Sequence, residues 1–514
     1  MTSSPRIIVI GAGVGGLTAA ALLAQVGYAV TVLEAQTYPG GCASTYYHKG
    51  FRFDSGATVA GGFQPNGPHA LVGQMLDIQW PVQRHEPAWV VHLPQNTIAL
   101  TADNQDVLHN FPQSAHFWDE QSRIADLCWS LSAYGLPWPP GDLAEAAQLV
   151  RAGLAFFPRD LRLAPFAFAP VAQWLRWRGL ARDKAFVRFI DAQLLIAAQT
   201  ISPRVNALYG ATALDLARQG VYHVQGGIGG LAQTLVAKLR ALGGEILYRQ
   251  TVTRIAVENG QVTGVYTRHG KHARKEEFFP CDFLLANTTP WSLDTLLGED
   301  SPRALRREVQ TRADGAGAFV LHLGVEADKL PPNLPDHHQI IASLDGPLGE
   351  GRSIFISISP TWDTARAPAG QRAVTVSTHT EIRQWWQLLQ TDSAAYYARK
   401  AEYTERMLTM IERALPGFRR SITLTLPGTP VTYQHYTGRH LGMVGGFPQT
   451  SLFAVRGPRV GLVNLRLVGD SIFPGQSTAG VTLGALRVVR DVRRHLDERI
   501  IKISVRENTL METP

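Results

Sequence analysis

Residues 6–34 read RIIVIGAGVGGLTAAALLAQVGYAVTVLE and carry the strongest structural signal in the chain. Arg6–Ile10 is a short apolar run, which predicts a buried strand of a parallel sheet. Residues 17–26 are rich in Ala and Leu and predict a helix, and residues 29–33 predict a second strand. A strand, a helix and a strand in this order are typical of the α/β fold class.

The turn between the first strand and the helix holds Gly11, Gly13 and Gly16 in a G-x-G-x-x-G pattern. Such glycines allow a tight turn, close approach of the backbone to a diphosphate, and close packing of helix on strand. The helix start then offers free N–H groups to phosphate, and Glu34 follows where a carboxylate accepts hydrogen bonds from a ribose. In this context the pattern predicts a dinucleotide site rather than a glycine-rich turn of an unrelated domain. Its residues are Gly11, Ala12, Gly13, Val14, Gly15, Gly16, Glu34 and Ala35.

Length and composition constrain the number of domains and the type of protein in which this motif lies. With 514 residues, 45% of them apolar and 18% charged, the chain is expected to form two or three folded domains. Its three cysteines lack metal-type spacing, so neither a disulfide framework nor a metal site is predicted, and a reducing compartment is expected. No uncharged apolar run reaches transmembrane length, and no secretory signal is expected before the first strand.

Two further stretches decide which dinucleotide is expected. YPGGCASTYYHKGFRFDSGA follows the acidic residue at 38–57, and LRLVGDSIFPGQSTAGVTLGALRVVRDV lies near the other end at 465–492. Together with the first motif, this set resembles the FAD-dependent amine oxidase and phytoene desaturase superfamily, and the resemblance implies FAD. It also implies site residues: Gly41 and Cys42 beside the ribityl chain and ring, Asp470 at the ribityl or diphosphate region, and Val481 at a helix start facing the ring. A backbone group near Val252 is expected to contact the adenine.

The resemblance also implies the architecture: a split, Rossmann-like FAD-binding domain of the glutathione reductase type with an inserted α+β substrate domain. The FAD-binding domain is expected to comprise residues 1–75, 220–290 and 440–500. The substrate and membrane-docking domain is expected to comprise residues 76–219 and 291–439. Residues 501–514 are polar and are expected to form a frayed tail.

The early and late motifs indicate a branch of this superfamily. Amine oxidases usually have Gly-Gly-Arg in the early loop, whereas this chain has Gly40, Gly41 and Cys42. The string resembles the carotenoid isomerases and desaturases, most of all the bacterial carotenoid 3′,4′-desaturases. Cys42 is interpreted as a small neutral loop residue rather than a redox thiol.

Residues 151–188 are both aromatic and basic, with eight Lys or Arg against two Asp. An apolar polyene substrate would have to be taken from a bilayer, and such a segment suits peripheral docking on anionic headgroups. The alternative is a helical core whose arginines extend outward. A nucleic-acid surface is not expected, because no recognition module is present.

The resemblance implies an FAD-dependent carotenoid desaturase that dehydrogenates a C–C bond beside a polyene, with the 3′,4′ bond as the first candidate. Alternatives are a carotenoid cis–trans isomerase that uses reduced FAD, an amine oxidase, and a non-catalytic lipid carrier of the same fold. The expected location is the cytoplasmic side of a membrane, and the electron acceptor is unknown. No catalytic base is assigned: His223 is a candidate, but it is interpreted as a histidine fixed by local hydrogen bonds.

Overall fold

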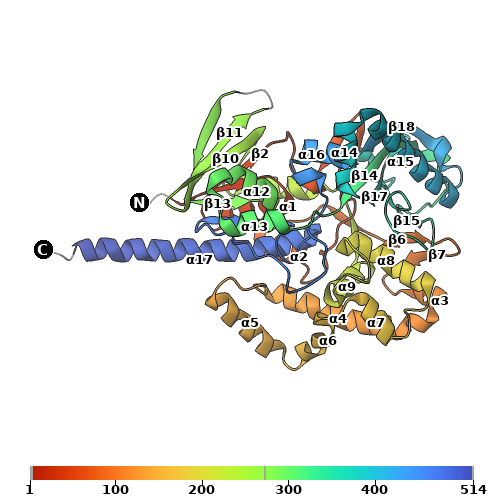
Figure 1. The fold of residues 1–514 in the computed structure, drawn as a ribbon, viewed down its shortest axis with the longest axis horizontal. Coiled ribbons are helices and arrows are strands. Elements are labelled where there is room, and N and C mark those ends of the chain that lie inside the picture. Colours follow the sequence, from red (N-terminus) through yellow and green to blue (C-terminus); the bar gives the residue numbers. More distant parts are fainter. Residues whose placement is uncertain (1–3, 271–273, 512–514) are drawn as a thin grey trace.

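The computed structural model describes residues 4–270 and 274–511. Its first layer is a parallel five-stranded sheet in the order β19-β13-β1-β2-β9 (Figure 1). The strands are β1 Arg6–Ile10, β2 Ala29–Glu34, β9 Glu245–Tyr248, β13 Phe283–Ala286 and β19 Leu465–Leu467. The strands predicted at residues 6–10 and 29–33 are confirmed, and one sheet is assembled from the beginning, middle and end of the chain.

Three helices pack with this sheet: α1 Val14–Gln25, α11 Gly230–Ala241 and α17 Thr478–Met511. Helix α1 contacts both of the other helices, and its Ala19, Ala20 and Ala21 are fully buried. Because it is enclosed on several sides, α1 is apolar all round rather than along one stripe. Helix α17 extends outward from the body (Figure 1), and the described part of the predicted frayed tail belongs to it. Residues 512–514 of that tail lie outside the described residues.

Smaller elements surround this layer. The antiparallel sheet β10-β11-β12 comprises Gln250–Glu258, Gln261–His269 and Glu276–Pro280. Asn259 and Gly260 connect its first two strands with positive φ angles, as a tight hairpin requires. The other elements are β3 Thr45–His48, β4 Phe51–Asp54, α2 Pro68–Leu76, β5 Val82–His85, β8 Val221–Val224, α12 Pro290–Leu297 and α13 Arg303–Thr311.

The second layer is a seven-stranded sheet in the order β18-β14-β17-β16-β15-β6-β7. Its strands are β6 Trp89–His92, β7 Thr97–Leu100, β14 Gly317–Glu326, β15 His337–Ile341, β16 Ser353–Ile358, β17 Gln371–Thr380 and β18 Ile422–Gly428. Alternate residues of β14 face opposite ways: Phe319 and Leu321 join a core with Trp385 of helix α14 (Ile382–Thr391), while Val320 and His322 line a cavity. Helix α15 (Ser393–Ala414) completes that core, and α16 (Pro430–Thr437) follows β18.

A helical lobe lies below the two sheets in Figure 1. Its elements are α3 Gln105–Asn110, α4 Ala115–Tyr134, α5 Leu143–Phe156, η3 Arg159–Leu163, α6 Ala164–Ala167, α7 Val171–Trp177, α8 Lys184–Ala198, α9 Ala207–Ala213 and α10 Leu216–Gln219. Fully buried aromatic side chains, among them Phe117, Trp174 and Phe186, form its core. No helix in the described part of the chain is long and apolar enough to cross a membrane.

The aromatic residues of the predicted docking segment divide between the core and the surface of this lobe. Trp174 is fully buried and Phe166 nearly so, whereas Phe157, Phe168 and Trp177 are 62%, 79% and 46% exposed. The buried rings agree with the helical-core interpretation, whereas the docking interpretation stays a prediction that would concern the exposed rings. One helix, α7, carries a core tryptophan and a surface tryptophan three positions apart.

The basic residues of segment 151–188 divide into those with a polar partner and those without one. Arg178 pairs with Glu120, Lys184 pairs with Asp345 at 3.3 Å, and the buried Arg188 donates to backbone carbonyls. Among the described residues, no ion-pair partner is present for five exposed cations: Arg151, Arg159, Arg162, Arg176 and Arg182. The charge free to meet an anionic surface is therefore smaller than the excess of six counted from the sequence.

Helix α5 is held by charged side chains at its first turn only. Asp142 caps it and pairs with Arg459 and Arg494, and Glu145 pairs with Arg487 of α17 at 3.1 Å. Beyond this turn, Ala152 is the single buried residue among the described residues of α5. The helix is thus fixed to the body at one end and exposes apolar side chains toward the other.

The two tryptophans of α7 give a matched test of the lobe core. Trp174→Ala removes a fully buried ring whose Nε1 donates to Glu120 at 2.6 Å, and should lower the free energy of unfolding by about 3–5 kcal/mol. Trp177→Ala should lower it by less than about 1 kcal/mol, because that ring is half exposed. Urea denaturation followed by tryptophan fluorescence measures both, and equal losses would contradict this division between core and surface.

Candidate FAD and substrate cavity

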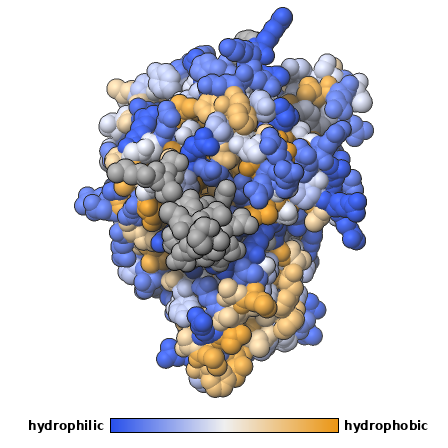
Figure 2. Space-filling view, turned by 90° about the vertical axis from the view of Figure 1, so that its left-hand side faces the viewer, coloured by the Kyte–Doolittle hydropathy of each residue, from blue (hydrophilic) through white to orange (hydrophobic). Residues whose placement is uncertain are grey.

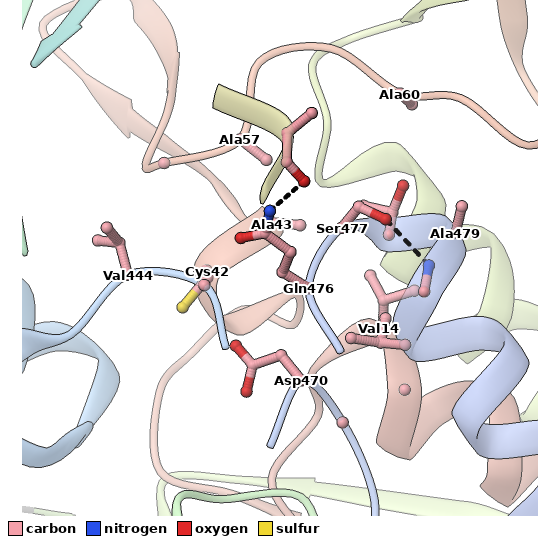
Figure 3. A pocket seen from close by; sticks show the side chains of 18 of the residues that line it. Val14, Cys42, Ala43, Ala57, Ala60, Val444, Asp470, Gln476, Ser477 and Ala479 are labelled. Atoms are coloured by element: carbon pink, nitrogen blue, oxygen red, sulfur yellow. Dashed lines mark hydrogen bonds between the residues drawn. The ribbon is translucent and has the colours of Figure 1, made fainter. Parts of the chain in front are cut away.

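A cavity of about 1320 Å³ joins the five-stranded sheet, the seven-stranded sheet and the helical lobe. A single small-molecule site usually measures about 300–1,000 Å³, so this cavity is larger than one ligand requires. Figure 3 shows part of its wall, where Val14, Cys42 and Asp470 approach one another from three separate segments. The lining includes these predicted site residues: Gly11, Gly13, Val14, Gly15, Glu34, Gly41, Cys42, Asp470 and Val481.

The turn from β1 into α1 forms one wall of the cavity. Gly11 has a φ of +89°, which a side chain would strain, and Gly13 is the N-cap of α1. A Cβ on Gly16 would lie 2.7 Å from the carbonyl oxygen of Gly11, so only glycine lets the helix pack this closely on the strand. The unpaired N–H groups at the start of α1 therefore face the cavity, in the arrangement that binds phosphate.

Asn287, at the end of β13, holds this turn in place and was missed by the sequence analysis. Its side-chain oxygen accepts a hydrogen bond from the Gly13 N–H at 3.0 Å, and its nitrogen donates to the Val468 carbonyl at 3.2 Å. A Cβ on Gly13, Gly16 or Gly469 would lie within 3.0 Å of its amide atoms. The asparagine amide therefore links the backbone that follows β1 to the backbone that follows β19. It fits between them because the glycines at these positions have no side chains.

Glu34, at the end of β2, is buried and lines the cavity. Its two carboxylate oxygens accept hydrogen bonds from the Ala12 N–H at 2.7 Å and the Gln36 N–H at 2.8 Å. Burial raises the pKa of Glu34, and these backbone hydrogen bonds oppose that rise. Each oxygen retains a second lone pair, so the carboxylate is held in place and still has acceptor capacity toward a ribose.

The early loop Gly40–Cys42 crosses in front of the α1 start. Gly40 has a φ of +118°, and its N–H donates to the Ala12 carbonyl at 2.8 Å. Burial raises the pKa of the Cys42 thiol although the nearby Arg439 lowers it, so the thiol is protonated at neutral pH. Such a neutral thiol agrees with its interpretation as a small loop residue.

The late motif brings Asp470 to the same wall, together with a cation that the sequence analysis missed. Arg439, just after α16, pairs with Asp470 at 3.0 Å and also lines the cavity. Burial lowers the pKa of Arg439, but the Asp470 carboxylate more than offsets this and raises it overall. No sequence motif connects two residues 31 positions apart, so only the fold reveals this ion pair.

The start of α17 faces the cavity beside these groups. The Ser477 hydroxyl accepts a hydrogen bond from the Gly480 N–H at 3.0 Å, as the dashed line in Figure 3 shows. Val481, one residue further, lines the cavity. Two helix starts, those of α1 and α17, thus point their positive dipole ends into one space.

Four predicted site residues do not line the cavity: Ala12, Gly16, Ala35 and Val252. Ala12 and Gly16 belong to the turn between β1 and α1. The Ala12 N–H holds Glu34, and Gly16 lets α1 pack closely on β1. Val252 lies on β10, where it pairs with Thr267, and its contact with an adenine stays a prediction. His223 is buried and does not line the cavity. Its Nε2 lies 2.7 Å from Oδ2 of Asp363, so a local hydrogen bond fixes the ring. No cluster of potential metal ligands is present in the described residues.

The residues present fit FAD. The α1 start suits a diphosphate, Glu34 suits a ribose, and the α17 start suits the electron-rich side of a flavin ring. When bound, FAD supplies a two-electron acceptor at its ring. The chain's own part is to hold the cofactor at both ends and to surround the ring with wall residues that exclude water.

The site geometry predicts the effect of changing Glu34. Glu34→Gln keeps the size of the side chain but loses its charge, and should raise the Kd of FAD by roughly 10-fold, since hydrogen bonds to charged groups contribute about 1.5–3 kcal/mol. Glu245→Gln on the exposed edge strand β9 is the control and should leave the Kd unchanged. Titration of the apoprotein with FAD, followed by flavin fluorescence, measures both, and an unchanged Kd in Glu34→Gln would contradict a role in ribose binding.

Comparison with known proteins identifies the family. The model of the family "flavin containing amine oxidoreductase" matches residues 14–493. Among curated proteins, the chain is 30% identical to the chloroplastic prolycopene isomerase of Daucus carota, over 95% of this chain and 80% of that protein. It is 25% identical to the neurosporene-forming phytoene desaturase of Cereibacter sphaeroides, over 95% of this chain and 94% of that protein.

Solved structures share the fold. An oxidoreductase from Methanosarcina mazei superposes with a TM-score of 0.65 at 19% identity, covering 94% of this chain and all of that one. Cyclohexylamine oxidase from Brevibacterium oxydans superposes with a TM-score of 0.60 at 15% identity, covering 96% of this chain and all of that one. The family match, the sequence relatives and the fold agree with the motifs at both ends of the chain. The chain therefore belongs to the flavin containing amine oxidoreductase family, as an FAD-dependent oxidoreductase of the carotenoid desaturase and isomerase superfamily.

Proposed function

We propose that this enzyme takes a carotenoid from a membrane and changes one C–C bond of its polyene beside the flavin. The first candidate reaction is desaturation, with the 3′,4′ bond as its target, as the motifs suggested. The second candidate is cis–trans isomerisation with reduced FAD, which is supported by the 30% identity to a prolycopene isomerase. The continuous cavity, which runs from the cofactor motifs to an exposed apolar part of the lobe, is the observation that carries the proposal.

The far end of the cavity lies in the helical lobe. There it is lined by Leu149 of α5, Leu163 of η3, and Trp138 and Phe453 from two loops. Immediately outside, large apolar side chains reach solvent; they are Val150, Leu154, Phe157, Leu161, Phe168 and Phe453, each at least 57% exposed. Figure 2 shows an orange area at the bottom of the molecule, where Figure 1 places α5 and α6. An exposed apolar area beside a cavity mouth is typical of a membrane or ligand contact.

The substrate's chemistry explains why such a mouth is useful. A long polyene leaves water with a large gain in free energy, at about 25 cal/mol per Å² of apolar surface. Transfer from lipid tails to an apolar cavity is nearly neutral, because both environments are equally apolar. An enzyme that draws the polyene from a bilayer thus avoids an aqueous step, and this supports peripheral membrane attachment, which we propose to be on the cytoplasmic side.

Cations lie next to the exposed apolar side chains. Arg151, Arg159 and Arg162 are exposed on α5 and η3, where no ion-pair partner is present among the described residues. Each basic residue near an anionic membrane surface contributes about 1 kcal/mol of attraction. Together with inserted Leu and Phe side chains, these charges support reversible docking.

The cavity wall supports chemistry by positioning rather than by a protein base. Among its described lining residues, Glu34 and Asp470 are the only carboxylates, and both belong to the cofactor end. Burial lowers the pKa of His322 to about 3 and that of His379 to about 4, so these two of the three described lining histidines are neutral at pH 7. A polyene delocalises developing positive charge along its own chain, so holding the reacting bond over the ring is the protein's main contribution.

Pigment analysis tests the reaction. The gene would be expressed in bacterial hosts that accumulate different carotenoids, with hosts lacking the gene as controls, and the pigments analysed by absorbance and mass. Desaturation predicts loss of H₂ and absorption at longer wavelength, whereas isomerisation predicts altered retention at constant mass. Unchanged pigments in every host, with peroxide released from amines instead, would contradict the carotenoid assignment.

Vesicle binding tests the docking surface. A variant that combines Leu154→Ser, Phe157→Ser and Phe168→Ser should bind anionic vesicles at least roughly 10-fold more weakly, because each buried apolar side chain contributes about 1.5–3 kcal/mol. Phe278→Ser, which changes an exposed residue of β12, is the control and should bind as the unmodified protein does. Co-sedimentation with the vesicles measures both, and equal binding by all three proteins would contradict docking through this lobe.

A further inference from the structure

Arg439 is the strongest feature of the cavity that the motifs leave unexplained. Its side chain is only 13% exposed. Nε donates to the Met443 carbonyl at 2.8 Å, Nη2 donates to the Gly445 carbonyl at 2.6 Å, and Nη1 donates to an Asp470 oxygen at 3.2 Å. The guanidinium is therefore fixed in one orientation, with its edge toward the wall that carries the late motif.

One donor of this guanidinium is still available. A guanidinium has five N–H groups. Hydrogen bonds to two carbonyls and one Asp470 oxygen use three of them, and the ion pair of Nη2 with the other Asp470 oxygen at 3.0 Å engages a fourth. The remaining N–H, on Nη1, has no partner among the described residues. Because Arg439 lines the cavity, this donor is available to a ligand there.

At the cofactor end of the cavity, Arg439 is the one cationic side chain among the described lining residues. Among the described lining residues, the other Lys or Arg side chains are Arg487 and Arg490 of α17. Arg487 donates to the Trp138 and Pro139 carbonyls, and Arg490 donates to the Gly135 carbonyl at 2.8 Å. Both therefore belong to the lobe end of the cavity, away from the α1 start.

The charge balance at the cofactor end favours such a cation. The diphosphate of FAD carries about two negative charges, and Glu34 and Asp470 add two carboxylates to the same wall. A helix start offers only about half of a positive charge, and burying unbalanced charge is costly. Arg439 is the full positive charge that the described residues place among these groups.

Its position is close to the early loop as well. The guanidinium lowers the pKa of Cys42 through space, which places the charge next to the loop that crosses the α1 start. Arg439 therefore lies between Cys42 of the early loop and Asp470 of the late motif. These two segments and the α1 start are the predicted contacts of the central part of FAD.

We propose that Arg439 is a cofactor-binding residue that balances the negative charge of FAD and donates a hydrogen bond to it from Nη1. The ion pair with Asp470 orients the guanidinium for this contact. A positive charge at this position also favours the reduced, more negative flavin. Loss of the charge should therefore weaken FAD binding and make the bound flavin harder to reduce.

Two substitutions separate charge from structural support. Arg439→Lys keeps the positive charge but loses most of the carbonyl contacts, and should raise the Kd of FAD by less than about 3-fold. Arg439→Gln loses the charge, and should raise the Kd by at least roughly 10-fold, as expected for a charge-assisted hydrogen bond. Flavin fluorescence titration gives the Kd, and a dye-based redox titration should show a lower reduction potential for Arg439→Gln alone.

Arg487→Gln is the matched control. It removes a buried, ion-paired arginine from the other end of the same cavity, and should leave the Kd of FAD unchanged. The proposal is overturned if Arg439→Lys and Arg439→Gln weaken binding equally, because the arginine would then only support the 439–445 loop. It is also overturned if neither Arg439 variant changes the Kd, or if Arg487→Gln weakens binding as much as Arg439→Gln.

A measurement on the unmodified protein makes the test independent of how the variants fold. Salt screens charge attraction, so the Kd of FAD should rise as NaCl is increased, and riboflavin, which has no phosphate, should show a smaller rise. If FAD binding is insensitive to salt, charge balance does not hold the cofactor and the proposal fails.

Discussion

The rest of the structure depends on the close contact between the asparagine at the end of β13 and the glycine-rich turn. Asn287 lies where Cβ atoms on Gly13, Gly16 and Gly469 would be, and its amide bonds to backbone on both sides. Strands from the beginning, middle and end of the chain meet at this one point. Without it, the α1 start, the early loop and the late motif would not face a common space, and the cavity would lose its cofactor end.

The cavity has two chemically different ends, and this difference organises the molecule. The cofactor end holds the two carboxylates, the arginine and the helix starts. Glu34 and Arg439 are fixed by hydrogen bonds to backbone groups, and Asp470 is held by its ion pair with Arg439. The other end is lined by leucine and aromatic side chains and opens beside an exposed apolar surface. The seven-stranded sheet forms a wall of the cavity and turns its opposite face toward the core formed with α14 and α15. Under the proposed function, the charged cofactor and the apolar substrate would occupy different regions of one continuous space.

The sequence predicts the parts of this arrangement that depend on local patterns. The strand–turn–helix unit and Glu34 follow from local spacing, because each uses neighbouring residues, whereas the role of Asp470 in the late Gly-Asp motif was implied by the family resemblance. Asn287 and Arg439 were missed because their partners lie far away in sequence, and neither belongs to a pattern that a reader of one chain would recognise. The lobe segment was only partly predicted: Trp174 and Trp177 look alike in sequence, yet burial depends on which side of α7 meets the core.

The attachment of α5 by its first turn has a consequence for the proposed membrane-bound form. Ion pairs between Asp142 and the arginines Arg459 and Arg494 of the body are partly exposed at the first turn of α5, whereas the exposed apolar side chains lie toward its far end. In solution, water of high dielectric constant weakens those attractions, whereas contact with lipid would replace much of that water by a medium of low dielectric constant. Attachment to a bilayer would thus strengthen the ion pairs at the first turn of α5 while its apolar far end lies in lipid, so the helix would be held at both ends.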